Sequence, residues 1–379
     1  MKIRIPDFIK SLKPYRAGKP ISELAREKGL SKIVKLASNE NPLGSSPLAL
    51  EAVKRELADS YRYVDPRAYK LTHAIAEKLG VAHENIVCGA GVDSLLAYII
   101  KTFTEKDDEV LTAEGTFIGI FVNTQKLDRR LKTTPLKDYA YDLKALETQI
   151  TDKTKIIYIA NPNNPTGTML TRDELINFVG RVPEDRIIIL DEAYHHFASE
   201  HSGYTNGLSF SFPNVIVTRT FSKDYGLAGL RIGYAVSHQE LTKALLKVKL
   251  PFEPSAPGQA AALAALEDKD YVVKSLRLNK KSLDKIRSGL VRLEIRFVET
   301  KANFILMIFD SERIAARFCE ECMNRGLILR HTDSFGIPEG VRISSGTDVE
   351  IEFALEILEE ALNSMSQPAT RRAETSRLA

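Results

Sequence analysis

The chain has 379 residues, 44% of them hydrophobic, and its 53 basic and 50 acidic side chains leave a net charge of +3. This length suffices for a large core and two or three domains, and the balanced charge argues against a nucleic-acid partner. No stretch is long enough to predict a membrane span, and the N-terminus lacks the apolar core of a signal peptide. Three cysteines without a disulfide pattern fit a reducing compartment, so we predict a cytoplasmic protein.

Strands and helices alternate along most of the chain. In order, the pattern predicts a short strand over 85–88, a helix from 93, buried strands over 155–160 and 186–190, and an apolar β-branched run at 215–217. A helical run over 260–287, a strand over 304–309 and a helix over 311–325 follow. Apolar strands alternating with helices are typical of a mostly parallel sheet covered on both faces.

This order of elements predicts the domain organisation. We expect an N-terminal arm at 1–44, a large domain at 45–255 and a small C-terminal domain at 256–365. The small domain, together with the arm, would close over a substrate. Residues 366–379 are polar and are expected to form a disordered tail.

Three polar residues follow predicted strands. Asn164 lies in a turn rich in Asn, Pro and Gly, and Asp191 comes directly after the strand at 186–190. Lys223 lies in a loop and precedes three glycines, at positions 226, 229 and 233. Ligands gather beyond the carboxyl ends of strands in such sheets. We therefore expect an amide, a carboxylate and an amine to meet at one edge.

Pyridoxal phosphate chemistry uses this set of groups. A lysine amine, here Lys223, bonds to the cofactor aldehyde and then serves as a general base, while the ring accepts electrons. Asp191 would keep the ring nitrogen protonated. Asn164 and Tyr194 would donate to the ring oxygen.

A phosphate cradle is also predicted. Gly91 and Val92 would point backbone amides at an anion from a helix N-terminus, and hydroxyl donors and a guanidinium would add to them. The three further residues are Thr220, Ser222 and Arg231. A nucleotide-binding dehydrogenase is disfavoured because its fingerprint would have glycine where Ser94 stands.

Seven motifs extend the pattern over almost the whole chain, at 36–44, 62–66, 89–93, 162–167, 191–194, 222–231 and 341–344. In their order and content, the chain resembles the histidinol-phosphate aminotransferases, a family of fold-type I pyridoxal-phosphate enzymes. The resemblance implies a large αβα domain with a mostly parallel sheet and a smaller α+β C-terminal domain. It also implies a homodimer, in which the arm makes dimer contacts and Tyr63 reaches the partner's cofactor phosphate.

The activity that the resemblance implies is transamination of L-histidinol phosphate with 2-oxoglutarate, which gives imidazole-acetol phosphate and L-glutamate in histidine biosynthesis. Two alternatives remain open, an aromatic amino acid aminotransferase and a threonine-phosphate decarboxylase, because these relatives share most of the motifs. A transcription regulator on the same fold is disfavoured because the arm before Asn39 is too short for a DNA-binding domain.

Other roles come from the resemblance alone. Phe117 matches the aromatic residue that stacks on the cofactor ring, and the substrate-binding positions correspond to Tyr15, Asn41, Arg330 and Arg342. Three residues depart from the family pattern: Gly115 stands where proline is usual, His196 where glutamate is common and Val92 where serine is frequent. No metal site is predicted, because His195 and His196 have no third ligand at a suitable spacing.

Overall fold

A computed structural model of the protein describes residues 3–12, 20–210 and 212–366. These residues form two compact units. The large unit contains Glu40–Arg277, Glu299–Ala302 and the described part of residues 1–15. The small unit contains Leu278–Val298 and the described parts of residues 16–39 and 303–379. The domain boundaries expected from the sequence stay a prediction.

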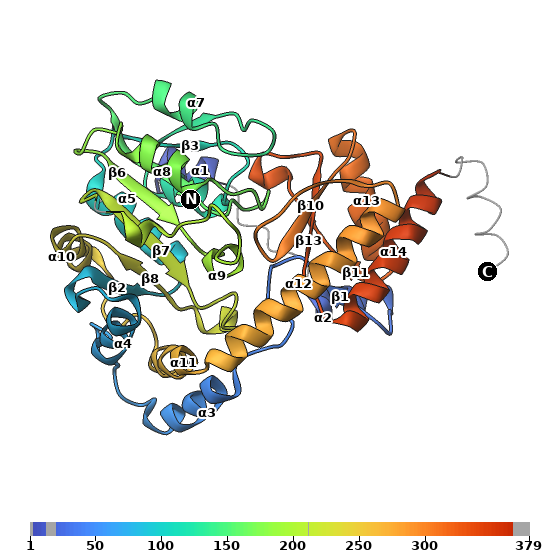
Figure 1. The fold of residues 1–379 in the computed structure, drawn as a ribbon, viewed down its shortest axis with the longest axis horizontal. Helices are drawn as coiled ribbons and strands as arrows, with labels where there is room; N and C mark the ends of the chain where they lie inside the picture. Colours follow the sequence, from blue (N-terminus) through green and yellow to red (C-terminus); the bar gives the residue numbers. More distant parts are fainter. Residues whose placement is uncertain (1–2, 13–19, 211, 367–379) are drawn as a thin grey trace. The chain divides into compact units, whose positions relative to one another are not determined.

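The large unit is built on a twisted sheet (Figure 1). Within the described ranges its seven strands have the order β2-β8-β7-β6-β5-β3-β4. They are β2 (Ile86–Gly89), β3 (Glu109–Ala113), β4 (Arg130–Thr134), β5 (Thr154–Ala160), β6 (Ile187–Asp191), β7 (Val215–Thr220) and β8 (Gly233–Val236). β8 is antiparallel to both neighbours, and the pairs from β7 to β4 are parallel. The expected mostly parallel α/β sheet is confirmed.

Helices cover both faces of this sheet. The large unit contains α1 (Asp7–Ser11), α3 (Pro47–Glu56), α4 (Tyr69–Leu79), α5 (Val92–Phe103), α6 (Ile118–Lys126), α7 (Leu143–Thr148), α8 (Arg172–Val179), α9 (His195–Ala198), α10 (Gln239–Val248) and α11 (Ala256–Glu267). Short 3-10 turns lie at η1 (Leu57–Asp59), η2 (His83–Asn85), η3 (Gly207–Ser209) and η4 (Ala228–Leu230).

Alternate residues of the central strands enter two different cores. In β6, Ile189 packs with α5 and α10, whereas Ile188 and Leu190 pack with α7 and α8. Successive side chains of a strand point to opposite faces, and here both faces are buried. This alternation determines the face of the sheet toward which each side chain at the end of β6 points.

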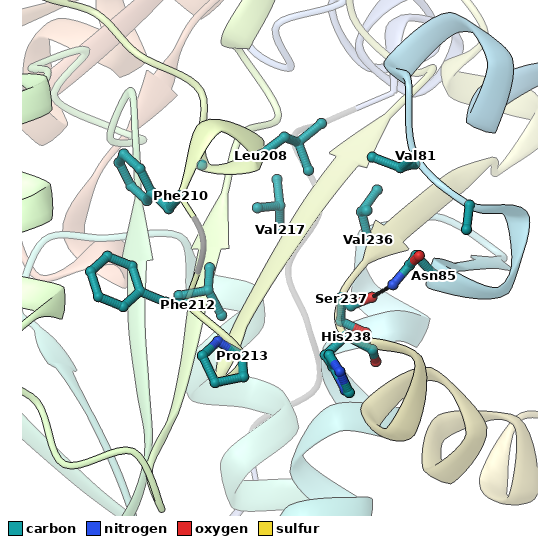
Figure 2. A pocket seen from close by; sticks show the side chains of 13 residues that line it. Val81, Asn85, Leu208, Phe210, Phe212, Pro213, Val217, Val236, Ser237 and His238 are labelled. Carbon is teal, nitrogen blue, oxygen red and sulfur yellow. Dashed lines mark hydrogen bonds between the residues drawn. The ribbon is translucent and has the colours of Figure 1, made fainter.

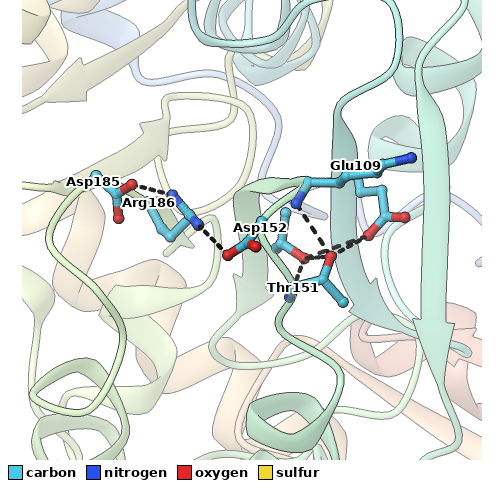
Figure 3. Close-up of polar contacts among 7 residues, drawn as sticks. Glu109, Thr151, Asp152, Asp185 and Arg186 are labelled. Atoms are coloured by element: carbon cyan, nitrogen blue, oxygen red, sulfur yellow. Dashed lines mark hydrogen bonds and ion pairs between the residues drawn. The ribbon is translucent and has the colours of Figure 1, made fainter.

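Polar contacts join the amino ends of three central strands (Figure 3). Thr151, just before β5, donates to the Glu109 carboxylate at the start of β3 over 3.1 Å. Arg186, just before β6, pairs with Asp185 and lies 4.0 Å from Asp152. The groups expected to do chemistry lie at the other, carboxyl edge of the sheet.

The helical run predicted over 260–287 consists of two helices. α11 ends at Glu267, and α12 (Lys269–Arg292) begins after Asp268. The Asp268 carboxylate accepts a hydrogen bond from the Tyr271 amide over 3.2 Å and another from the Ser46 hydroxyl over 2.5 Å. Asp268 therefore caps the new helix instead of continuing the old one.

The small unit is an α+β structure, as expected. Its elements are α2 (Ile21–Lys28), β1 (Val34–Lys35), β9 (Arg296–Val298), β10 (Phe304–Ile308), α13 (Glu312–Asn324), β11 (Leu327–Ile328), β12 (Arg330–His331), η5 (Asp333–Phe335), β13 (Gly340–Ser344) and α14 (Asp348–Ser366), with the end of α12. Among the described residues, β12, β13, β10 and β9 form an antiparallel sheet, and β1 pairs with β11. α13 and α14 bury their apolar sides against a core that includes Ile305 and Ile343.

Candidate active site

Asp191 is the last residue of β6 and is buried, with 4% of its surface exposed. Its Oδ2 accepts a hydrogen bond from the Tyr158 hydroxyl over 2.7 Å, and its Oδ1 accepts one from the Ala193 amide over 3.1 Å. Burial raises the pKa of the Asp191 carboxyl to about 6, and these hydrogen bonds act in the opposite direction. A positively charged ring nitrogen placed against this carboxylate would favour its ionised form.

Lys223 lies in the loop after β7, beside Tyr194. Its Nζ is 5.6 Å from the centroid of the Tyr194 ring, and its carbonyl accepts a hydrogen bond from the Gly226 amide over 3.0 Å. Tyr194 is almost fully buried and directly precedes α9. The fold therefore brings together the lysine and the tyrosine that the sequence placed on separate segments.

Two contacts anchor the residue after this lysine. His196 Nδ1 lies 2.6 Å from the buried carboxylate of Asp224. The Asn41 side-chain amide donates to the Asp224 carbonyl over 2.9 Å and to the Ser275 hydroxyl over 2.8 Å. His196, which departs from the family pattern, thus joins the segment of Tyr194 to the lysine loop, and Asn41 holds the same loop from the other side.

The turn that carries Asn164 is fixed by hydrogen bonds. The Asn163 side chain donates to the Gly115 carbonyl over 2.9 Å and accepts from the Thr116 hydroxyl over 2.8 Å. Its backbone bonds with Thr168 and Gly167 close the turn. Asn164 itself is buried, with 7% of its surface exposed. The turn thus presents Asn164 at the carboxyl end of β5.

The predicted phosphate cradle lies around the first residues of α5. Gly91 has a φ of 83°, and a Cβ built on it would lie 2.6 Å from the Arg231 guanidinium. A Cβ on Gly233 would lie 3.0 Å from the Val92 amide nitrogen. Glycine is therefore needed at both positions, because each lets a guanidinium or a neighbouring strand approach the helix N-terminus. A helix N-terminus and a guanidinium together suit a phosphate group.

Hydroxyl groups extend this cradle at the end of β7. The Thr220 hydroxyl donates to Ser222 Oγ over 2.9 Å and accepts from the Ser222 amide over 3.1 Å. The half-exposed Arg231 guanidinium lies 3.9 Å from the Asp93 carboxylate, in the first turn of α5. The five predicted phosphate ligands therefore come from three neighbouring segments of the large unit.

Phe117 lies at the N-cap of α6, next to the start of α5. A Cβ built on Gly119 would come within 2.4 Å of the Phe117 ring and 2.5 Å of the Asp93 carboxylate. The aromatic ring and the first turn of α5 are therefore close neighbours, as stacking above a ring held at this edge would require.

The two predicted substrate arginines belong to the small unit. Arg330 of β12 lies directly opposite Arg342 of β13 in their antiparallel pairing. Arg342 is 3% exposed, donates to the Ala37 carbonyl over 2.8 Å and lies over the rings of Phe304 and Phe335. Residues directly opposite each other share one face of a sheet, so both arginine side chains leave the same face.

Two further tyrosines, Tyr63 and Tyr15, were predicted for the site, and the structure describes only Tyr63. Tyr63 is 84% exposed and stacks on Phe252, with ring centroids 4.4 Å apart. Tyr15 lies outside the described residues. Both roles stay predictions.

The contact between Tyr158 and Asp191 was not predicted from the sequence. Its signal was present, since a tyrosine inside the buried apolar run of β5 needs a partner for its hydroxyl. The partner could not be identified without the register of β5 against β6.

A separate pocket lies at the opposite end of β7 from Lys223 (Figure 2). Its wall is mostly apolar and includes Phe210, Phe212 and Val217, and it contains none of the residues predicted for the site. Within the described ranges, no group of three His, Cys, Asp or Glu residues is placed to hold a metal ion. The described helices include none that is long and apolar enough to cross a membrane.

Comparison with known proteins gives the class to which this site belongs. The family model described as aminotransferase class I and II matches residues 31–358. The chain belongs to this family of aminotransferases.

Within this family, the chain is similar to histidinol-phosphate aminotransferases. The chain is 39% identical over 358 residues to histidinol-phosphate aminotransferase 2 of Pseudomonas fluorescens, a match that covers 93% of this chain and 96% of the relative. Its sequence is 30% identical to that of the Sinorhizobium meliloti histidinol-phosphate aminotransferase, whose crystal structure is in complex with pyridoxal-5'-phosphate. That match has a TM-score of 0.89 and covers 96% and 98% of the two chains.

A more distant structure supports the fold. The aspartate aminotransferase of Thermus thermophilus with maleate matches with a TM-score of 0.82 at 21% identity, over 95% of this chain and 100% of that one. The expected fold-type I architecture is confirmed.

Proposed function

We propose that this chain transfers the amino group of L-histidinol phosphate to 2-oxoglutarate with pyridoxal phosphate, giving imidazole-acetol phosphate and L-glutamate. The observation that carries the proposal is the match to histidinol-phosphate aminotransferases over more than nine tenths of both chains. The meeting of Asp191, Tyr194 and Lys223 at one sheet edge supports the chemistry.

The residues of the large unit fit the cofactor. Gly91, Val92, Thr220, Ser222 and Arg231 would hold its phosphate, and the glycine at 91 leaves space that a Cβ would fill. Phe117 would stack on its ring. When bound, pyridoxal phosphate supplies an electron-accepting ring that stabilises the carbanion formed at the substrate α-carbon.

The protein groups then have distinct tasks. Lys223 Nζ would hold the cofactor covalently and, once displaced by the incoming amine, move a proton at the substrate α-carbon as a general base. Asp191 would keep the ring nitrogen protonated through its ionised carboxylate. Tyr194 and Asn164 would donate hydrogen bonds to the ring oxygen.

The paired arginines of the small unit favour a phosphate-bearing substrate. Two guanidinium groups on one sheet face suit a doubly charged anion better than a single carboxylate. We therefore assign Arg330 and Arg342 to the substrate phosphate. Asn41 and Tyr15 complete the proposed substrate contacts, with Asn41 acting where it also holds the lysine loop.

We also propose a homodimer in which Tyr63 serves the partner's cofactor phosphate. Its exposure and its stacking on Phe252 leave the side chain available to a second chain. A subunit carrying Tyr63→Phe mixed with one carrying Lys223→Ala should regain activity above either variant alone, because one site of the mixed dimer is intact. A Tyr63 that acted within its own chain would give no such gain. A cytoplasmic location stays a prediction.

The first experiment records the visible absorption of the cofactor-loaded protein during separate additions of L-histidinol phosphate, L-phenylalanine and L-glutamate. The band of the lysine-bound cofactor should convert to the amine form fastest with L-histidinol phosphate. Faster conversion by phenylalanine would replace the proposal with an aromatic aminotransferase. Release of carbon dioxide would instead indicate the decarboxylase.

A further inference from the structure

Tyr158 lies behind the predicted ring-nitrogen partner. It is fully buried in the middle of β5, and its hydroxyl donates to Asp191 Oδ2 over 2.7 Å. The other carboxylate oxygen accepts from the Ala193 amide. The Asp191 carboxylate is therefore held from two directions, by one side chain and one backbone group.

The register of the sheet explains this contact. Tyr158 is paired with Ile189 and Ala160 with Asp191, so Tyr158 and Asp191 are diagonal neighbours on the face that packs against α5. Diagonal neighbours lie within reach when one side chain is long and aromatic. On the other side of Asp191, Thr218 of β7 is its register partner.

The Tyr158 hydroxyl favours the ionised form of the Asp191 carboxylate as well as filling space in the core. A buried phenol has to donate to an acceptor, and a bond to an ionised carboxylate is stronger than one to a neutral group. Burial disfavours ionisation of both side chains and raises the pKa of each. Because the phenol keeps its proton more strongly, it acts as the donor and favours the ionised carboxylate.

We propose that Tyr158 is a positioning residue, which orients the Asp191 carboxylate and keeps it ionised for the cofactor ring nitrogen. This inference rests on the proposed function, since it assigns Asp191 to that nitrogen. Tyr158 acts through Asp191 and need not touch the cofactor.

Tyr141 provides a matched control. It is also a buried tyrosine, but its hydroxyl bonds with the Thr116 hydroxyl over 2.7 Å and accepts from the Ala160 amide over 3.2 Å. Tyr141→Phe and Tyr158→Phe thus each remove one buried hydroxyl from the same region, but only the Tyr158 hydroxyl donates to Asp191, whereas that of Tyr141 bonds with Thr116 and Ala160.

The test measures cofactor affinity, by titrating the cofactor-free protein with pyridoxal phosphate at pH values on both sides of 6. Tyr158→Phe should weaken binding about tenfold or more. It should also raise the acid limit of binding, which is the pH below which pyridoxal phosphate binds more weakly, because the Asp191 carboxylate loses a hydrogen-bond donor. Tyr141→Phe should leave that acid limit unchanged. The proposal is overturned if Tyr158→Phe binds with the parent's affinity and acid limit, or if both variants shift alike.

A second variant keeps the test sharp if Tyr158→Phe does not fold. Replacing Tyr158 with a ring-fluorinated tyrosine keeps the shape and makes the hydroxyl a stronger donor, so the acid limit should move to lower pH. An unchanged limit would overturn the proposal. If the parent protein itself fails to bind pyridoxal phosphate, the proposed function fails; if it binds normally and only the expected shifts are missing, Tyr158 alone has been wrongly assigned.

Discussion

Two neighbouring carboxylates at the end of β6 have opposite surroundings. Asp191 and Glu192 are both buried, at 4% and 3% exposure. Asp191 faces α5 and accepts from two neutral donors, Tyr158 and the Ala193 amide. Glu192 faces the other side, where its Oε2 accepts from two nitrogens of Arg219 at 2.7 and 3.0 Å, and its Oε1 accepts from the Gly207 amide at 2.5 Å.

The difference shows how to separate a structural carboxylate from a functional one. A buried ion pair satisfies both charges within the protein, so Glu192 needs nothing more. At Asp191, burial raises the pKa more than the neutral hydrogen-bond donors lower it, and a raised pKa is common at functional sites. A cationic ring nitrogen would give Asp191 the opposite charge that Arg219 gives Glu192.

The largest effect is expected from Glu192→Gln. This change leaves the buried Arg219 guanidinium without its carboxylate, so the free energy of unfolding should fall by about 3–5 kcal/mol. Denaturant unfolding measures the loss. Turnover per folded molecule should stay close to that of the parent. A fall below about 1 kcal/mol would mean that the pair is not what stabilises this face of the sheet.

Asp191→Asn should act on catalysis instead. The amide cannot carry the charge that keeps the ring nitrogen protonated, so kcat/KM should fall by about 10²–10³-fold, as when one preorganised electrostatic group is removed. Steady-state kinetics check this. Asp142→Asn is the control, because Asp142 caps α7 by accepting from the Ala145 amide. Equal losses in both variants would contradict the assignment of Asp191.

The same variant should stabilise the cofactor-free protein. Burial raises the pKa of Asp191 from 3.8 to about 6, so the folded state keeps a proton that the unfolded chain releases, and this stability is lost as pH rises through 6. Asparagine does not ionise, so above pH 6 Asp191→Asn should gain up to about 3 kcal/mol. About half of that gain should remain one pH unit below 6. A pH-independent difference in thermal unfolding would argue against a raised pKa.

The smallest of the four effects is expected at the substrate arginines. Arg342→Ala should raise KM for L-histidinol phosphate about 10- to 100-fold, since a hydrogen bond to a charged group is lost, and should change kcat less. Arg325→Ala is the control, because Arg325 pairs with Glu321 on α13. If Arg342→Ala leaves KM unchanged for both L-histidinol phosphate and L-glutamate, Arg342 does not belong to the site.

The sequence was sufficient to predict that three of the candidate site residues lie at one edge of the sheet. Asn164, Asp191 and Lys223 each come after an apolar run, and parallel strands carry such residues to one edge. Tyr158 could not be assigned a partner in this way, because its contact depends on the register between β5 and β6. Local pattern also could not show that Asp191 and Glu192 face different cores, nor that Asp268 ends one helix and begins the next.

The most direct test of the proposed chemistry is the identity of the lysine that holds the cofactor. The protein loaded with pyridoxal phosphate would be reduced with borohydride, digested and mapped by mass spectrometry. We expect one phosphopyridoxyl group per chain, on Lys223, and none in Lys223→Ala. A label on another lysine, such as Lys78 beside the Tyr225 hydroxyl, or unchanged labelling of Lys223→Ala, would contradict the assignment of Lys223.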